Sequence, residues 1–349
     1  MNYNPLKIGD LTAKIPLVQG GMGVGISLSG LASAVANAGG VGIISTAQIG
    51  FRESGWESSP IETNLKAIAK ELRKARELSP KGILGFNIMV ATKRYEDYVR
   101  SAVKAGADII ISGAGLPVDL PKYVEGFKTK IAPIVSSVKA ATLICKLWLR
   151  RYNRIPDLVV IEGPKAGGHL GFTPEEAKNL TSDEYDIEVK KIIEEVKSCA
   201  ERSGRDIPVV VAGGIYSHED VRHVIEDLKA DAVQISTRFV PTIECDAPQE
   251  YKEAYLKARK EDIVITKSPV GMPGRAIANP FLAKTEKAKI KKCYQCLGKC
   301  NPKEIPYCIT TALVNAAKGN LDEALIFCGS EAWQTKEIVT VQDVINDTF

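Results

Sequence analysis

The residues best suited to chemistry lie in one loop, Ile161–Gly171, which reads Ile-Glu-Gly-Pro-Lys-Ala-Gly-Gly-His-Leu-Gly. Its single histidine, His169, carries the side chain whose ordinary pKa best suits proton transfer near neutral pH. The surrounding glycines have no Cβ, so the backbone can approach a flat or charged ligand closely. The loop follows the apolar run Asp157–Val160, which predicts a buried strand. A ligand-binding loop at the end of a buried strand is typical of a barrel active site.

The other histidines give weaker signals. His218 follows Ser217 at a predicted helix start, where a serine is expected to cap the helix. His223 falls within the same predicted helix, and we expect both to be structural or exposed. The alternative for His169 itself is a hinge or capping residue packed inside its loop.

Eight short apolar runs predict the strands that must position this loop. They are nearly continuous rather than alternating, which favours parallel strands buried on both faces. Helical patterns lie between them, so we predict an α/β fold, a (β/α)8 TIM barrel, with a doubly wound open sheet as the rival. The count of eight and the glycines at strand ends favour the barrel. The predicted strands are Ile15–Gln19, Val41–Ser45, Ile83–Met89, Asp108–Ser112, Ile131–Ser136, Leu158–Glu162, Pro208–Ala212 and Ala232–Ser236.

The alternation of strands and helices stops after Pro241. We therefore predict a barrel over residues 1–240, completed by a closing helix within about residues 322–349, and a smaller, mostly helical subdomain over residues 241–321. In that subdomain, Ala247–Lys260 is predicted as a helix and Ser268–Arg275 as a loop rich in proline and glycine. The amphipathic tail Ile338–Asp347 is the candidate for the closing helix.

The ends of the seventh and eighth predicted strands favour a phosphate-bearing cofactor. Gly213 and Gly214 follow one strand, and Ser236 and Thr237 follow the other. Barrels commonly bind phosphate at this place, through backbone N–H groups and a helix N-terminus. The glycines of Gly21–Gly25 give no convincing dinucleotide-binding fingerprint.

Taken together, several motifs resemble the nitronate monooxygenase (2-nitropropane dioxygenase-like) family, which is close to the flavin-dependent enoyl-acyl-carrier-protein reductases. The Ala-Gly-Gly-His block that ends at His169 is the most specific of them. The family usually has glycine where this chain has Ser236, and the serine narrows the freedom of the backbone there. The motifs are Pro16–Gly23, Gly85–Asn87, Glu162–Gly171, Val211–Ile215, Val233–Phe239, Lys267–Ala276 and Phe327–Ala332.

The resemblance implies FMN at the carboxyl-terminal face of the barrel. His169 would face the substrate beside the reactive edge of the flavin, and Asn87 would hydrogen-bond the ring system. Other residues would lie along the flavin, make room for it or hold its ribityl phosphate. The implied cofactor-binding residues are Gly21, Met22, Gly23, Asn87, Gly163, Gly168, Gly213, Gly214, Gln234, Ile235, Ser236 and Thr237.

The reaction implied by the resemblance is the oxidation of an alkyl nitronate by O₂ to a carbonyl compound and nitrite, without a nicotinamide. His169 would either orient the nitronate anion or take the α-proton of a neutral nitroalkane. Two rivals stay open. One is an NAD(P)H-dependent enoyl-acyl-carrier-protein reductase with FMN, and the other is a barrel that binds FMN or a metal without catalysis.

Four cysteines crowd into a short segment at Cys293, Cys296, Cys300 and Cys308. Thiolates spaced in this way can converge on a metal ion or an iron–sulfur cluster, although the spacing matches no zinc-finger or ferredoxin pattern cleanly. Iron–sulfur, zinc, free thiols and a redox disulfide are all open alternatives.

Composition predicts a globular cytoplasmic protein. Of its 349 residues 45% are hydrophobic, the net charge is only +4, and no apolar run approaches the length of a membrane span. We read the one lysine-rich piece, Lys284–Lys292, as a solvated helix face rather than a nucleic-acid site. The expected partners are a small-molecule substrate and O₂, without nucleic acid or membrane, and a homodimer is a further candidate.

Overall fold

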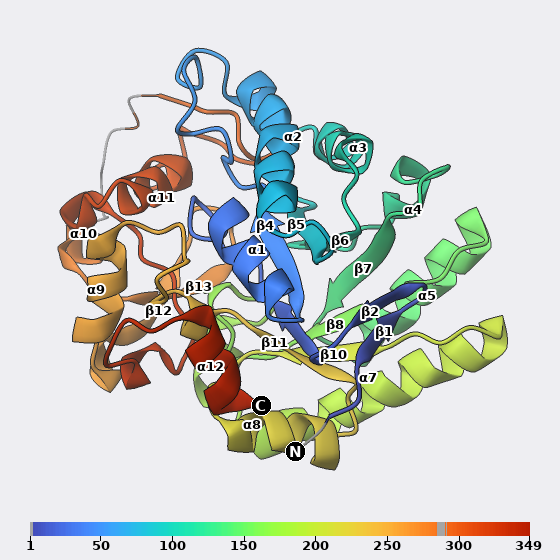
Figure 1. Cartoon of the computed structure of the whole chain (residues 1–349). Helices are drawn as coiled ribbons and strands as arrows, with labels where there is room; N and C mark the ends of the chain where they lie inside the picture. Colours follow the sequence, from blue (N-terminus) through green and yellow to red (C-terminus); the bar gives the residue numbers. More distant parts are fainter. Residues whose placement is uncertain (1–2, 285–289, 291) are drawn as a thin grey trace.

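The computed structural model describes residues 3–284, 290 and 292–349, so most of the lysine-rich piece Lys284–Lys292 lies outside the described residues. Its centre is a closed barrel of eight strands, and every neighbouring pair is parallel (Figure 1). The predicted (β/α)8 barrel is therefore confirmed against the open sheet. In order around the barrel, the strands are β3 Leu17–Gln19, β4 Val41–Ser45, β5 Ile83–Met89, β6 Ile109–Gly113, β7 Lys130–Val135, β8 Val159–Glu162, β10 Val209–Ala212 and β11 Ala232–Ile235.

Helices on the outside connect successive strands. In the ring of outer helices, α12 (Val341–Thr348) lies between α8 and α1, the place of a closing helix. No helix in the described part of the chain is long and apolar enough to cross a membrane. The connecting helices are α1 Ser29–Asn37, α2 Pro60–Leu78, α3 Tyr95–Ala105, α4 Leu120–Tyr123, α5 Val138–Tyr152, α6 Pro174–Asn179, α7 Ser182–Ser203 and α8 His218–Arg222, which continues as a π-helical turn over His223–Asp227.

A hairpin near the N-terminus closes the bottom of the barrel. It consists of β1 (Leu6–Ile8) and β2 (Leu11–Ala13), which pair antiparallel. Leu6 and Ile8 are buried and pack with the apolar side chains that fill the barrel interior. Burying each of them stabilises the fold by roughly 1.5–3 kcal/mol. The interior at this end is apolar and filled, so the space for a ligand lies at the opposite end.

The segment between β11 and α12 forms an insertion with helices and an unpredicted hairpin. Strands β12 (Ile263–Lys267) and β13 (Pro273–Ile277) pair antiparallel, and β13 also pairs with the short strand β9 (Gly168–His169). The prediction of a loop up to Arg275 is therefore wrong at its end, because the backbone there bonds to a strand on each side. Proline is tolerated because it takes the first position of β13. The helices of the insertion are α9 Gln249–Lys257, α10 Pro280–Lys284 and α11 Ile309–Ala317.

Candidate active site

A cavity of about 1250 Å³ lies at the carboxyl ends of the barrel strands. Residues at or just after every barrel strand line it, and the insertion supplies the remaining wall. Ligand sites of barrel enzymes lie at this face, because the connecting loops meet there. One lining residue from each strand end, in order around the barrel, is Gly21, Ser45, Asn87, Gly113, Ser136, Glu162, Gly213 and Ser236.

The structure brings most of the sequence-predicted site residues together in this cavity. Two do not line it. Ile235 is buried in the core with 1% of its surface exposed, and Gly163 packs beside Tyr185, whose Cε1 would lie 3.1 Å from an added Cβ. Ile235 lies behind the cavity wall because the pleat of β11 turns successive residues to opposite faces, whereas Gly163 lies just after the end of β8. The predicted residues that line the cavity are Gly21, Met22, Gly23, Asn87, Gly168, His169, Gly213, Gly214, Gln234, Ser236 and Thr237.

Backbone groups after β10 and β11 form a cradle suited to an anion. Gly213 and Gly214 have φ values of 101° and 81°, which side chains other than glycine rarely adopt. A Cβ on Gly213 would lie 2.9 Å from the backbone nitrogen of Ala166. Within the described residues, the N–H groups of both glycines donate to no protein atom. Thr237 begins a short 3-10 helix, Thr237–Phe239, whose first N–H groups also lack helical acceptors.

Glycines opposite this cradle let polar side chains reach the cavity. A Cβ on Gly20 would lie 2.1 Å from the hydroxyl of Ser236, so the serine fits because its neighbour is glycine. A Cβ on Gly21 would lie 2.3 Å from the Cβ of Asn87. The side-chain amides of Asn87 and Gln234 line the cavity and bond to no other described residue. Unpaired amides on a cavity wall are suited to a polar ring system.

His169 lies on β9, at the cavity wall that the insertion helps to build. Its Nε2 and the Ser268 hydroxyl are 2.7 Å apart, and the edge of Phe327 packs against its ring, with centroids 4.9 Å apart. Burial lowers the pKa of His169 to about 4, so the imidazole is neutral at physiological pH. No local pattern pairs Ser268 with His169, because the two are 99 residues apart and meet only through the β12–β13 hairpin.

A buried arginine fixes the loop that precedes His169. The Arg275 guanidinium donates to the backbone oxygens of Pro164 at 2.7 Å, Ala166 at 2.5 Å and Ala177 at 3.0 Å. Only 6% of Arg275 is exposed, so these bonds are shielded from water. Five rigid N–H donors make arginine suited to holding several carbonyls at once. Because Arg275 also pairs with Gly168 in the sheet, β13 holds both ends of this loop.

Glu162, at the end of β8, is a cavity residue that the predicted site does not include. Its carboxyl group lines the cavity, and burial raises its pKa to about 7. No opposing charge contributes to this shift. A carboxyl group that is half ionised near pH 7 can exchange protons with a ligand. The signal available in the sequence is a lone carboxylate at the carboxyl end of a barrel strand.

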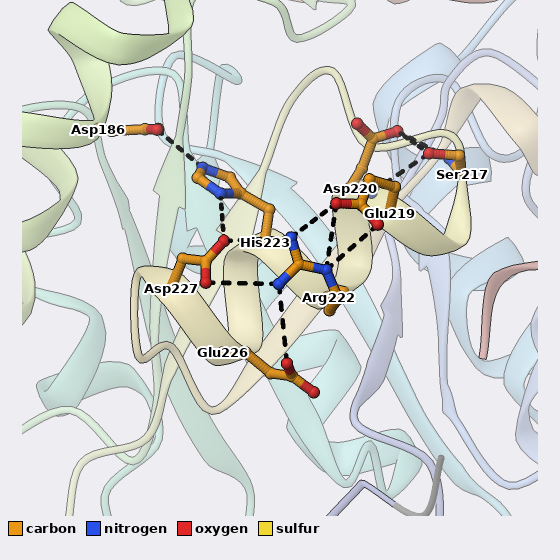
Figure 2. Close-up of polar contacts among 8 residues, drawn as sticks. All are labelled: Asp186, Ser217, Glu219, Asp220, Arg222, His223, Glu226 and Asp227. Atoms are coloured by element: carbon orange, nitrogen blue, oxygen red, sulfur yellow. Dashed lines mark hydrogen bonds and ion pairs between the residues drawn. The ribbon is translucent and has the colours of Figure 1, made fainter.

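The other histidines lie outside the cavity, as expected. His223 belongs to a charged network on the outer helices (Figure 2), with Nε2 2.8 Å from Asp186 and Nδ1 3.0 Å from Asp227. Burial lowers the pKa of His223, but its bonds to Asp227 and Asp186 outweigh that effect and raise it overall. His218 contacts the backbone oxygen of Thr348 at 3.1 Å through Nδ1 and so ties α8 to α12. Both histidines therefore have structural contacts.

The four clustered cysteines are close to one another but form no single-ion site. All four carry free thiols. All four line one small cavity, which shows their proximity. Across the described residues, no group of three or more histidine, cysteine or acidic side chains could hold a metal ion. The geometry therefore does not support the predicted zinc site.

Known proteins resemble this chain over most of its length. A protein of Staphylococcus saprophyticus named as a probable nitronate monooxygenase is 26% identical over 302 residues, which cover 79% of each chain. An indene-carboxyl-CoA dehydrogenase of Mycobacterium tuberculosis is 25% identical over 78% of this chain and 65% of its own.

Solved structures agree in fold. FabK from Thermotoga maritima is 26% identical, with a TM-score of 0.72 over 96% of this chain and 91% of FabK. Nitroalkane oxidase from Streptomyces ansochromogenes is 18% identical and has the same TM-score over 96% of this chain and 94% of its own, a likeness of fold alone. The family model described as nitronate monooxygenase matches residues 4–349. The chain is therefore a (β/α)8 barrel that belongs to the nitronate monooxygenase family.

Proposed function

We propose that this protein is an FMN-dependent oxidoreductase that oxidises alkyl nitronates with O₂ to a carbonyl compound and nitrite. The observation that carries the proposal is one cavity in which an anion cradle and a neutral histidine lie together, in a chain of this family. FMN, when bound, supplies the two-electron chemistry that links nitronate oxidation to the reduction of O₂.

The residues present fit a phosphorylated flavin. The free N–H groups of Gly213 and Gly214 would bind the phosphate, with the start of the 3-10 helix at Thr237 beside them. The unpaired amides of Asn87 and Gln234 would hydrogen-bond polar atoms of the cofactor. These donors lie on walls formed by different strands, as binding a flat group with an anionic tail requires.

His169 is assigned to orient the nitronate by a hydrogen bond rather than to take a proton. Its Nε2 already bonds with Ser268, so Nδ1 is the nitrogen left for the substrate. The fall of its pKa from 6.5 to about 4 disfavours the imidazolium form by about 3 kcal/mol. Abstraction of a carbon-bound proton would create that disfavoured cation in the cavity. The nitronate anion, which has already lost this proton, is therefore the proposed substrate.

The test is O₂ uptake and nitrite release by the flavin-loaded protein with a preformed nitronate and no NADH. We expect turnover with the nitronate and much slower turnover with the neutral nitroalkane. His169→Ala should keep its flavin and lose at least about 100-fold in kcat/KM, the usual effect of removing one hydrogen-bond donor to an anion in an active site. The matched control is His223→Ala, which removes an imidazole outside the cavity and should stay active. A His169→Ala protein as active as wild type would refute the assignment.

A second candidate is the NAD(P)H-dependent reduction of an enoyl thioester. One observation favours it: the M. tuberculosis relative is named for a CoA thioester. NADH consumption with a crotonyl thioester under anaerobic conditions, and no O₂ uptake with nitronate, would establish this activity instead. A yellow protein that turns over neither substrate would indicate a flavin-binding barrel without catalysis.

A further inference from the structure

A second, smaller cavity adjoins the main one, and all four clustered cysteines line it. Its volume is about 140 Å³. About 10–15 Å³ of such space is enough for one water molecule, so this space is larger than one ion needs. The thiols come from a segment of 16 residues that is held against the barrel. The lining cysteines are Cys293, Cys296, Cys300 and Cys308.

Contacts with two barrel loops fix the segment that carries these thiols. On one side, Lys93 N–H donates to the Cys296 oxygen and Gly298 N–H donates to the Ala91 oxygen, both at 3.0 Å. These bonds flank a bridge between Thr92 and Leu297 in the loop after β5. The thiols are therefore placed by the backbone rather than by chance contacts of a free loop.

The loop after β4 holds the beginning of the same segment. The ring of Tyr294 stacks on Trp56 with centroids 4.7 Å apart, and Trp56 is nearly fully buried. The Lys292 ammonium lies 2.6 Å from the Glu57 carboxylate. Both contacts place Cys293 and Cys296 against the barrel, so the thiols that they carry are preorganised.

Three lysines lie near the thiols. Lys93 and Lys292 line the small cavity, and Lys299 lines the main cavity between Cys296 and Cys300. Lys292 is paired with Glu57, whereas Lys93 bonds to the neutral side chain of Gln295 at 2.7 Å. A group that carries several thiolates is anionic, and an unpaired lysine beside it lowers the cost of bringing that charge into the protein.

As the side chains lie, no described group of three or more such ligands could hold a single metal ion. All four thiols nevertheless line one volume, which a group of several iron and sulfide ions would fill. Four cysteine thiolates are the usual ligands of both [2Fe–2S] and [4Fe–4S] clusters. We propose that Cys293, Cys296, Cys300 and Cys308 bind an iron–sulfur cluster in this cavity.

The cluster would lie directly beside the proposed flavin site. Cys296, Leu297, Gly298 and Cys300 line both cavities, so one stretch of chain forms the partition between them. This inference goes beyond the proposed reaction and depends on neither the identity of the substrate nor the binding of FMN.

The test uses the full-length protein, purified without oxygen and also reconstituted with ferrous iron and sulfide. We expect about two or four iron atoms per chain with as many acid-labile sulfides, and broad visible absorption that dithionite bleaches. Electron paramagnetic resonance of the reduced protein identifies the cluster type. Protein without iron above background after reconstitution would overturn the proposal, and so would stoichiometric zinc or a native disulfide between these cysteines.

Cysteine variants test whether these thiols are the ligands. Cys293→Ala and Cys308→Ser, which remove thiols that line only the small cavity, should each lose most of the iron and sulfide while they keep flavin and a cooperative melting transition. The matched control is Cys199→Ala, which removes a buried thiol on α7 and should keep the full iron content. Iron that persists in both cluster variants at the control level would also overturn the proposal. Flavin content is measured in the same samples, so loss of the cluster is distinguished from failure of the flavin site.

Discussion

Replacing Glu162 with glutamine should change how the stability of the flavin-free protein depends on pH. Burial raises the Glu162 pKa from 4.5 to about 7. The folded protein therefore binds this proton more tightly than the unfolded chain does. The resulting stability is fully present below pH 4.5 and is lost as the pH rises through 7. The loss reaches about 3 kcal/mol at pH 8.

The assay is urea unfolding of both proteins at pH 5 and at pH 8. Glutamine does not ionise, so its protein does not lose this stability as the pH rises. The unfolding free energy of Glu162→Gln relative to wild type should therefore rise by about 2.5 kcal/mol from pH 5 to pH 8. The control is Glu125→Gln, which changes an exposed carboxylate and should show a far smaller shift. A Glu162→Gln difference that is the same at both pH values would refute the inference that this carboxyl group is desolvated.

Three further substitutions test the site. Arg275→Met leaves three buried carbonyls unpaired and should lower the unfolding free energy by about 3 kcal/mol or more, measured by urea denaturation, and an undiminished midpoint would contradict its assigned role. Gly213→Ala meets both strain at φ 101° and the nitrogen of Ala166, so its FMN affinity by fluorescence titration should fall by at least tenfold. Ser268→Ala should reduce kcat for the nitronate by roughly threefold to tenfold, whereas Ser268→Thr keeps the hydroxyl and should retain most of it.

The barrel can be predicted because each of its strands is a local signal. Runs such as Val41–Ser45 and Ile83–Met89 are apolar at nearly every position, since parallel strands in a barrel are covered on both faces, and their observed bounds match the prediction. The carboxyl ends of such strands must meet at one face. Residues as distant as Asn87 and Gly213 can therefore be assigned to one site from the sequence alone.

The inserted hairpin and the details of the site depend on contacts between distant segments, which no local sequence pattern encodes. The β12–β13 hairpin contains Pro273 and Gly274, which are typical of loops, and its strand character comes from pairing with β12 and β9. Ser268 reaches His169 only through that pairing. The sequence pattern groups Ile235 with the site because its neighbours belong there, although its own side chain points into the core. The pKa of Glu162 follows from desolvation, which only a three-dimensional arrangement determines.

The pairing of β9 with β13 has a consequence for how this protein could change its substrate. His169 and Gly274 are partners in one ladder, so a shift of the inserted segment would be passed on to the imidazole that is proposed to orient the substrate. Mutations that reshape the insertion to admit a bulkier molecule would also re-aim that imidazole. Substrate selectivity and turnover rate are therefore linked at the β12–β13 hairpin. A natural or engineered variant that changes one of them would have to readjust the other.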